Sequence, residues 1–443
     1  MASATPMPKE ADLLIRGCGI LTLSQQGFIT QGAIAVKDGR ITYVGKEGAV
    51  PKLRVENVIE AEGKVAMPGF VNCHTHVAMT LFRGIAEDKP LGAWLRDTIW
   101  PLERKLTRED VYWGALLGCL EMIKSGTTCF ADMYFYEDAV AEAVEKAGLR
   151  AVLSQGIIEG TAELGMKTFN QALSFVEKHH EGAEERIKAW LGPHAVYTCS
   201  EQLLRRVRRA ASEKGVRIHI HLAESLEHAE KIQKNRGLTE VELLEKIGFL
   251  GPDVLAAHCI YLTEKDMRLL KKHGVKVAYN AVANAKLGLD ISPVEEMKEL
   301  GICVGLGTDG PASNNSLDMF ETMKFACLLQ KIRYRDATVM KTREAVEMAT
   351  LGGAKALGLE NDVGSLEPGK RADIILVDFR KPHLKPFHNV YANLVYASSG
   401  SDVDTVIVDG KILMEQRQVK VLDENKIMEK TEEKAFRLLR RNG

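Results

Sequence analysis

The chain has 443 residues, of which 45% are hydrophobic and 27% charged, and its formal net charge is −1. This composition is typical of a globular protein long enough for one large domain and a smaller one. The balanced charge gives no electrostatic reason to expect nucleic acid or an anionic membrane as a partner, and no apolar run approaches the ~20 residues that cross a bilayer.

The start of the chain and the cysteines bear on the compartment. Residues 1–17 lack the basic start and the continuous apolar core of a secretion signal. The eight cysteines are scattered, mostly inside apolar runs, and form no CxxC pair, which is typical of free thiols in a reducing compartment. We therefore expect a cytoplasmic protein.

Both ends of the chain carry β-strand patterns. Residues 11–63 alternate apolar and polar side chains around DG and GR turns, which predicts hairpins, and the same pattern returns at 371–379 and 403–421 before a final helix. Neither end is long enough to bury a core alone. We expect residues 1–66 and 368–443 to fold together as one small β-sandwich.

Between these ends, short apolar runs alternate with amphipathic stretches. The runs span 64–76, 127–135, 149–158, 187–198, 216–224, 253–262, 275–280 and 302–310. Amphipathic stretches such as 200–215 and 263–274 open with Ser or Thr and close on Gly, as helix caps do. Eight strands, each followed by a helix, predict an α/β fold with a parallel (β/α)8 TIM-type barrel over 67–367. No glycine-rich dinucleotide or phosphate loop follows a strand, which disfavours an open sheet.

Histidines and carboxylates gather at the C-terminal ends of the predicted strands, where barrel enzymes place their chemistry. These residues are His74 and His76 in the first run, His194 in the fourth, His221 and Glu224 in the fifth, His258 in the sixth and Asp309 in the eighth. Residues i and i+2 of a strand face the same side, so His74 and His76 can hold one ion together. Neutral imidazole and carboxylate suit a divalent ion such as zinc, and a catalytic site keeps one position open for water.

One His-x-His pair alone is a weak signal, because strands alternate in any case. With His221 and Asp309 also at the C-terminal ends of predicted strands, the four residues together predict a metal site. His219 faces the same side as His221 but lies deeper, which predicts a packed core residue. His228 opens a His-x-Glu sequence that lacks a Pro-Cys-x-x-Cys partner and lies in a helical stretch, so we expect it at the surface.

Five motifs carry a family resemblance. PGFVNCHTHVAMTLFRG, GPHAVYTCS, HIHLAES, LAAHC and GTDGPASNN together resemble the amidohydrolase superfamily, and more narrowly they are similar to the 5′-methylthioadenosine/S-adenosylhomocysteine deaminases. The similarity covers nearly the whole chain, including GSLEPGKRADIILVD near its end. Guanine deaminases and s-triazine hydrolases share much of this motif set.

The resemblance implies one divalent ion per chain, zinc or alternatively iron(II), with His74, His76, His221 and Asp309 around it. A single ion is expected because the fourth run, AWLGPHAVYT, lacks the terminal lysine of binuclear relatives. Such an ion lowers the pKa of a bound water.

The resemblance also implies roles in catalysis and substrate binding. Asp309 accepts the water's proton, His258 orients the attacking oxygen and stabilises charge, and Glu224 carries a proton to a ring nitrogen and to the leaving amine. Glu103 matches the carboxylate that binds a ribose diol, and His194 matches the histidine at the purine edge; Glu224 and Asp309 would also contact the substrate.

We therefore expect a hydrolase that deaminates a small nucleoside: 5′-methylthioadenosine, adenosine or 5′-deoxyadenosine, with S-adenosylhomocysteine as a further candidate. We also expect a homo-oligomer. The alternatives are a guanine deaminase or s-triazine hydrolase, and a non-catalytic scaffold, which the complete ligand set disfavours. The chain departs from its relatives at Ala281 and Ala283, where Pro and Ser are usual, and at Gln155, where many carry Arg. Residues 151–185 contain no arginine, so we expect a small or apolar 5′ group.

Overall fold

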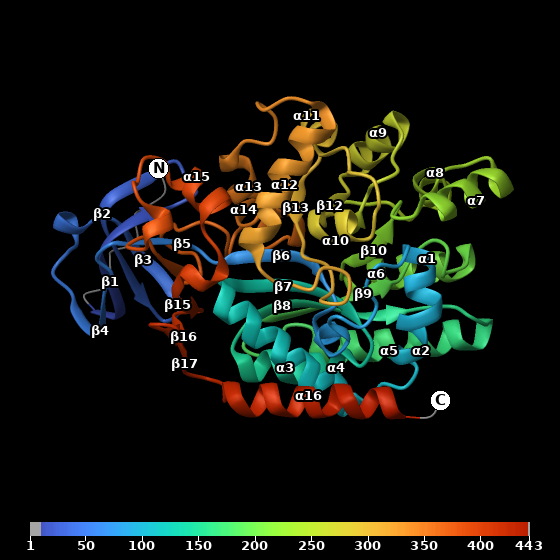
Figure 1. Cartoon of the computed structure of the whole chain (residues 1–443), viewed down its shortest axis with the longest axis horizontal. Coiled ribbons are helices and arrows are strands. Elements are labelled where there is room, and N and C mark those ends of the chain that lie inside the picture. Colours follow the sequence, from blue (N-terminus) through green and yellow to red (C-terminus); the bar gives the residue numbers. More distant parts are fainter. Residues whose placement is uncertain (1–9, 442–443) are drawn as a thin grey trace.

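Eight parallel strands form one of two sheets in the computed structural model, which describes residues 10–441 (Figure 1). They are β6 (Phe70–Thr75), β7 (Thr127–Tyr134), β8 (Arg150–Ile157), β9 (Ile187–Pro193), β10 (Ile218–Leu222), β11 (Val254–His258), β12 (Lys276–Tyr279) and β13 (Val304–Leu306). Each strand pairs with the next in sequence order. The backbone N–H of Asp309 donates to the carbonyl of His74 at 2.9 Å, which brings the end of β13 against β6. The predicted (β/α)8 barrel is confirmed.

Helices follow the barrel strands. After β6 come η2 (Val77–Phe82), α1 (Leu91–Trp94), the π-helical turn η3 (Leu95–Ile99) and α2 (Trp100–Glu103). The others are α3 (Arg108–Ser125), α4 (Glu137–Ala147), α5 (Ala162–His179), α6 (Glu201–Lys214), α7 (Leu226–Arg236), α8 (Glu240–Lys246), α9 (Glu264–His273), α10 (Ala281–Lys286), α11 (Val294–Glu299), α12 (Met319–Tyr334), α13 (Thr342–Met348) and α14 (Leu351–Leu357). Local sequence sets their ends: the Ser200 side chain caps α6, and Gly215 ends it at φ +66°.

The two chain ends build the second, mixed sheet, which lies at the left of Figure 1. Its strands are β1 (Glu10–Leu21), β2 (Phe28–Lys37), β3 (Arg40–Lys46), β4 (Arg54–Glu60), β5 (Lys64–Pro68), β14 (Ile374–Asp378), β15 (Val403–Val408), β16 (Lys411–Glu415) and β17 (Gln418–Val419). Antiparallel pairing of β14 with β5 joins the ends, as expected. The short α15 (Val390–Ala392) follows β14, and the final helix α16 (Glu424–Arg440) lies along α3.

Buried contacts connect the sheet to the barrel. The Arg150 guanidinium at the start of β8 contacts the Asp373 carboxylate at 3.0 Å, and both side chains are buried. The domain boundaries predicted at 66/67 and 367/368 stay a prediction. All eight cysteines are free thiols. Across residues 10–441, no helix is both long and apolar enough to cross a bilayer.

Candidate active site

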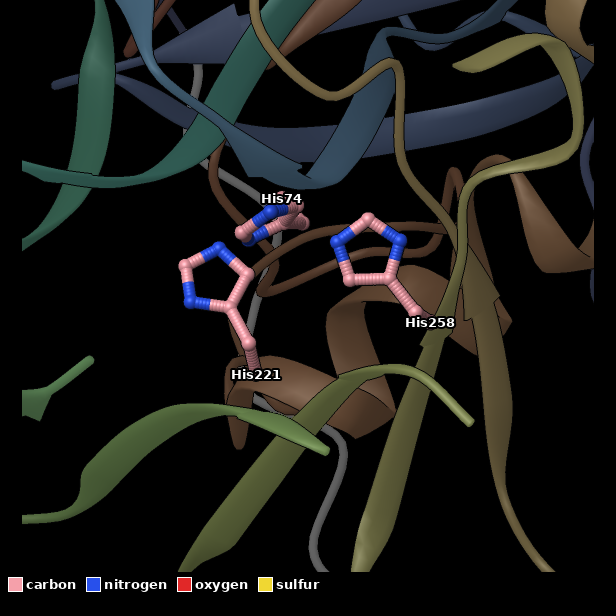
Figure 2. Close-up of side chains that lie close together, drawn as sticks. All are labelled: His74, His221 and His258. Carbon is pink, nitrogen blue, oxygen red and sulfur yellow. The ribbon is translucent and has the colours of Figure 1, made fainter. Parts of the chain in front are cut away.

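The predicted metal ligands converge at the C-terminal end of the barrel. His74 lies in β6 and His76 directly follows it, His221 lies in β10, and Asp309 follows β13. Because parallel strands end at one rim, residues more than 200 positions apart meet there. Figure 2 shows the rings of His74, His221 and His258 turned toward one another, and their ligand atoms lie within 4.8 Å of each other.

Short distances join the four side chains. Asp309 Oδ1 lies 3.4 Å from His74 Nε2 and 3.3 Å from His76 Nε2. His221 Nε2 lies 3.3 Å from His76 Nε2. Among the residues that the structure describes, the buried atoms His74 Nε2 and Asp309 Oδ1 have no hydrogen-bond partner. Buried polar atoms without partners are costly, so this convergence calls for a cation.

Hydrogen bonds at the other ring nitrogens set the tautomers. His76 Nδ1 donates to the carbonyl of Met133 at 2.6 Å, and His221 Nδ1 donates to the carbonyl of His194 at 2.8 Å. A carbonyl oxygen can only accept, so the Nε2 lone pair of each neutral ring faces the centre. His74 Nδ1 lies 2.9 Å from His219 Nε2. His219 is therefore buried as predicted and also holds a ligand in place, which the sequence reasoning missed.

The electrostatics suit a divalent metal ion. Burial lowers the pKa of His74 to about 3 and that of His221 well below its ordinary value, so both rings are neutral. Burial alone would raise the pKa of Asp309, but the surrounding histidines lower it below its ordinary range. Three neutral imidazoles and one carboxylate are a donor set that zinc binds. The residues present fit the predicted ion.

Glu224 and His258 lie beside this cluster. Glu224 Oε1 is 3.6 Å from His258 Nε2, and both residues are buried. Burial raises the pKa of Glu224, which favours a protonated carboxyl group. His258 Nδ1 lies 3.0 Å from Asn284 Oδ1 and 3.3 Å from Asn280 Nδ2, so Nε2 faces the site. Asn284 lies on α10, which also accommodates Ala281 and Ala283 as buried residues.

Replacing Asn284 with alanine should lower kcat by about 10-fold, because His258 loses the closer of the two amide contacts at its Nδ1. The metal content should stay at the wild-type value, since Asn284 contacts no predicted ligand. Asn284→Asp retains an oxygen acceptor and should keep most of the rate. Steady-state kinetics and elemental analysis test this, and a fully active Asn284→Ala would remove the assigned role.

A pocket extends from the cluster, and all four predicted substrate contacts line it: Glu103, His194, Glu224 and Asp309. His258 lines it as well. Burial raises the pKa of Glu103 to about 7, a rise that the neighbouring Tyr134 hydroxyl opposes. His194 Nδ1 lies 3.0 Å from Thr198 Oγ1.

Several residues of the site escaped sequence reasoning. Trp94, Trp100 and Tyr197 line the same pocket, and the Ser313 hydroxyl donates to Asp309 Oδ2 at 2.6 Å. Ser313 lies in the motif GTDGPASNN, which was the available signal in the sequence.

His228 is half-buried and stacks on Tyr197 with ring centroids 3.7 Å apart, so it is not the simple surface residue that we predicted.

A second, more open cavity adjoins the pocket. Glu103 and Tyr197 line both, and the outer cavity continues along α5 past Lys167 and Lys178. Gln155 also lines it, but the Gln155 amide oxygen accepts the backbone N–H of Glu137 at 3.1 Å. Gln155, which stands where many relatives carry arginine, therefore uses its amide oxygen to bond the backbone of this chain.

Comparisons with known proteins agree with this geometry. The model of the amidohydrolase family matches residues 65–413. The chain belongs to the amidohydrolase family. Among family relatives, a Pelotomaculum thermopropionicum protein named 5-methylthioadenosine/S-adenosylhomocysteine deaminase is 50% identical over 97% of this chain and 100% of its own. A Methanosarcina mazei protein named 5′-deoxyadenosine deaminase is 48% identical over 97% and 99%.

Solved amidohydrolase structures share the fold. A crystal structure of an adenosine deaminase from Xanthomonas campestris, with bound zinc, superposes with a TM-score of 0.94. It is 31% identical and covers 98% of this chain and 100% of that one. The predicted superfamily resemblance is confirmed, and the site residues stay predictions for this chain.

Proposed function

We propose that this amidohydrolase removes the amino group of adenine nucleosides by hydrolysis, releasing ammonia and the inosine analogue. The proposal rests on the Glu103 carboxyl group, which lines the same pocket as the predicted metal ligands His76, His221 and Asp309. A carboxylate there suits the two hydroxyls of a ribose, whereas free guanine or a triazine offers it no diol. The names of the relatives support the same substrate class.

In this proposal His74, His76, His221 and Asp309 hold one zinc ion. The ion, when bound, activates a water for attack on the amino-bearing ring carbon. Asp309 accepts a proton, and Ser313 fixes its second oxygen. Glu224 donates its proton to the adjacent ring nitrogen, then takes the remaining proton of the attacking oxygen and passes it to the leaving amine as the C–N bond breaks. The proton held by Asp309 then restores the Glu224 carboxyl group. His258, oriented by Asn284, presents Nε2 to the attacking oxygen as its hydrogen-bond partner.

The test is ammonia release from a panel of methylthioadenosine, adenosine, 5′-deoxyadenosine, S-adenosylhomocysteine, guanine and a triazine. We expect kcat/KM for the adenine nucleosides to exceed that for guanine by orders of magnitude. Lys167 and Lys178 offer ammonium groups to a carboxylate in the outer cavity, so S-adenosylhomocysteine belongs in the panel despite the missing arginine. A preference for guanine or the triazine would establish the alternative instead, and no turnover would favour the scaffold.

Glu103→Ala should lower kcat/KM for nucleosides about 10²-fold, since hydrogen bonds to a charged group contribute ~1.5–3 kcal/mol each. The loss should be selective, because guanine and 2′,3′-dideoxyadenosine lack the diol and never use this carboxylate. Kinetics on matched substrates with and without the diol measure the effect. An equal loss of kcat/KM on substrates with and without the diol, or no loss on adenosine, would show that Glu103 does not recognise the ribose.

A further inference from the structure

The Glu240 carboxylate, at the start of α8, is buried against the strand end that carries the active-site glutamate. Glu240 is 4% exposed, and its Oε2 accepts the backbone N–H of Ala223 at 2.9 Å. Ala223 lies between Leu222, the last residue of β10, and Glu224. A helix that begins 17 residues further along the chain therefore contacts the peptide unit between Leu222 and Ala223, one unit before the peptide that joins Ala223 to Glu224.

The N-terminal cap of α8 does not account for this carboxylate. Thr239 and Glu242 already form the capping box: Glu242 Oε2 accepts the N–H of Thr239 at 2.9 Å, and Thr239 Oγ1 accepts the N–H of Glu242 at 3.1 Å. Glu240 is thus free to serve another part of the chain, and the hydrogen bond that it accepts comes from Ala223.

The Ala223 backbone has an unusual conformation that needs support. Its φ is +50°, in the left-handed region that residues with a Cβ rarely adopt. Its carbonyl accepts the backbone N–H groups of Ile260 at 3.0 Å and Tyr261 at 2.9 Å. The peptide groups on both sides of this strained residue are therefore bonded, the N–H by Glu240 and the carbonyl by the segment after β11.

Both bonded ends lead directly to reacting groups. Glu224 follows Ala223, and Ile260 lies two residues after His258, so the support at Ala223 fixes the two backbones whose side chains meet at 3.6 Å. We propose that Glu240 is a positioning residue for Glu224, acting through the Ala223 backbone. This inference rests on the proposed function of Glu224, which the deamination reaction uses as proton donor.

The test compares side chains of similar size with and without an oxygen acceptor. Glu240→Met fills the space but cannot accept the Ala223 N–H; Glu240→Gln can. Burial raises the pKa of Glu240 to about 7, so the neutral form also occurs in the native protein, and the neutral amide should serve. We expect Glu240→Met to lower kcat ~10²-fold with little change in KM or metal content, as small misplacements do. Glu240→Gln should stay near wild type.

Glu242→Ala is the matched control, because it disturbs the cap of the same helix without contacting Ala223. It should lower thermal stability and leave kcat near wild type. Glu240→Ala is made alongside in case methionine does not fit. Equal rate losses in Glu242→Ala and Glu240→Met, or an unrescued Glu240→Gln, would show a general effect of α8 and overturn the proposal.

Amide hydrogen exchange gives a readout that needs no substrate. Fragments covering 222–226 should exchange faster in Glu240→Met and Glu240→Ala than in wild type, Glu240→Gln or Glu242→Ala. Unchanged exchange in both non-accepting variants would overturn the positioning role even if activity fell. If the wild type deaminates guanine or a triazine, the proposed substrate class fails, and the same kinetic comparison is made on that compound.

Discussion

Glu224→Gln should lower kcat by at least ~10²-fold, the range expected when a positioned acid or base is removed. Glutamine keeps the shape of the side chain but cannot carry a proton to the ring nitrogen or to the leaving amine. Because burial raises the pKa of this carboxyl group, it holds its proton to a higher pH than an exposed glutamate does. The ion should remain, since Glu224 is not a predicted ligand.

Steady-state kinetics and elemental analysis on the same preparation measure this effect. Glu227→Gln is the control: Glu227 lies three residues further on, is exposed on α7 and should not affect the rate. Folding and metal content should match the wild type in both variants. A Glu224→Gln enzyme with full metal and near-wild-type kcat would assign the proton transfer to another group.

Strand-end placement allowed the ligand set to be predicted from sequence. His74, His76, His221 and Asp309 each follow or end an apolar run, and parallel strands of a barrel end at one rim. The position of these four residues at the strand ends therefore places their backbones near one another, whichever rotamers their side chains adopt. The joining of the two chain ends was predicted because neither end can bury a core alone, but hairpin patterns do not tell which strands pair, such as β14 with β5, some 300 residues away.

Contacts around the ligands were beyond sequence reasoning. His219 has the same alternation as His221, and only the packed barrel places its ring nitrogen 2.9 Å from His74. Asn284 reaches His258, and Glu240 reaches Ala223, from helices whose positions depend on tertiary packing. In sequence, any glutamate in the first turn of a helix is interpreted as a charge that stabilises the helix N-terminus. The sequence therefore did not distinguish Glu240 from Glu242.

His221→Ala should remove the bound ion and reduce activity below detection. His221 presents its Nε2 lone pair from β10 toward His76 and His74, and alanine offers no donor in its place. The three remaining side chains would retain a weakened site, open to solvent on one side. We expect wild-type protein to hold about one zinc per chain and the variant to hold almost none after dialysis.

The control for this loss is His388→Ala, which removes an exposed histidine far from the barrel rim in sequence and should leave the ion bound. Elemental analysis should also distinguish one ion from two. The lysine nearest to a second site on β9 is Lys188, at the start of the strand, where its Nζ contacts Glu181 at 3.2 Å. It lies at the wrong end of β9 to bridge two ions, and β9 itself ends in Gly192 and Pro193. Two ions per chain, an active enzyme without metal, or a His221→Ala variant that keeps its ion would each contradict the assigned ligand set.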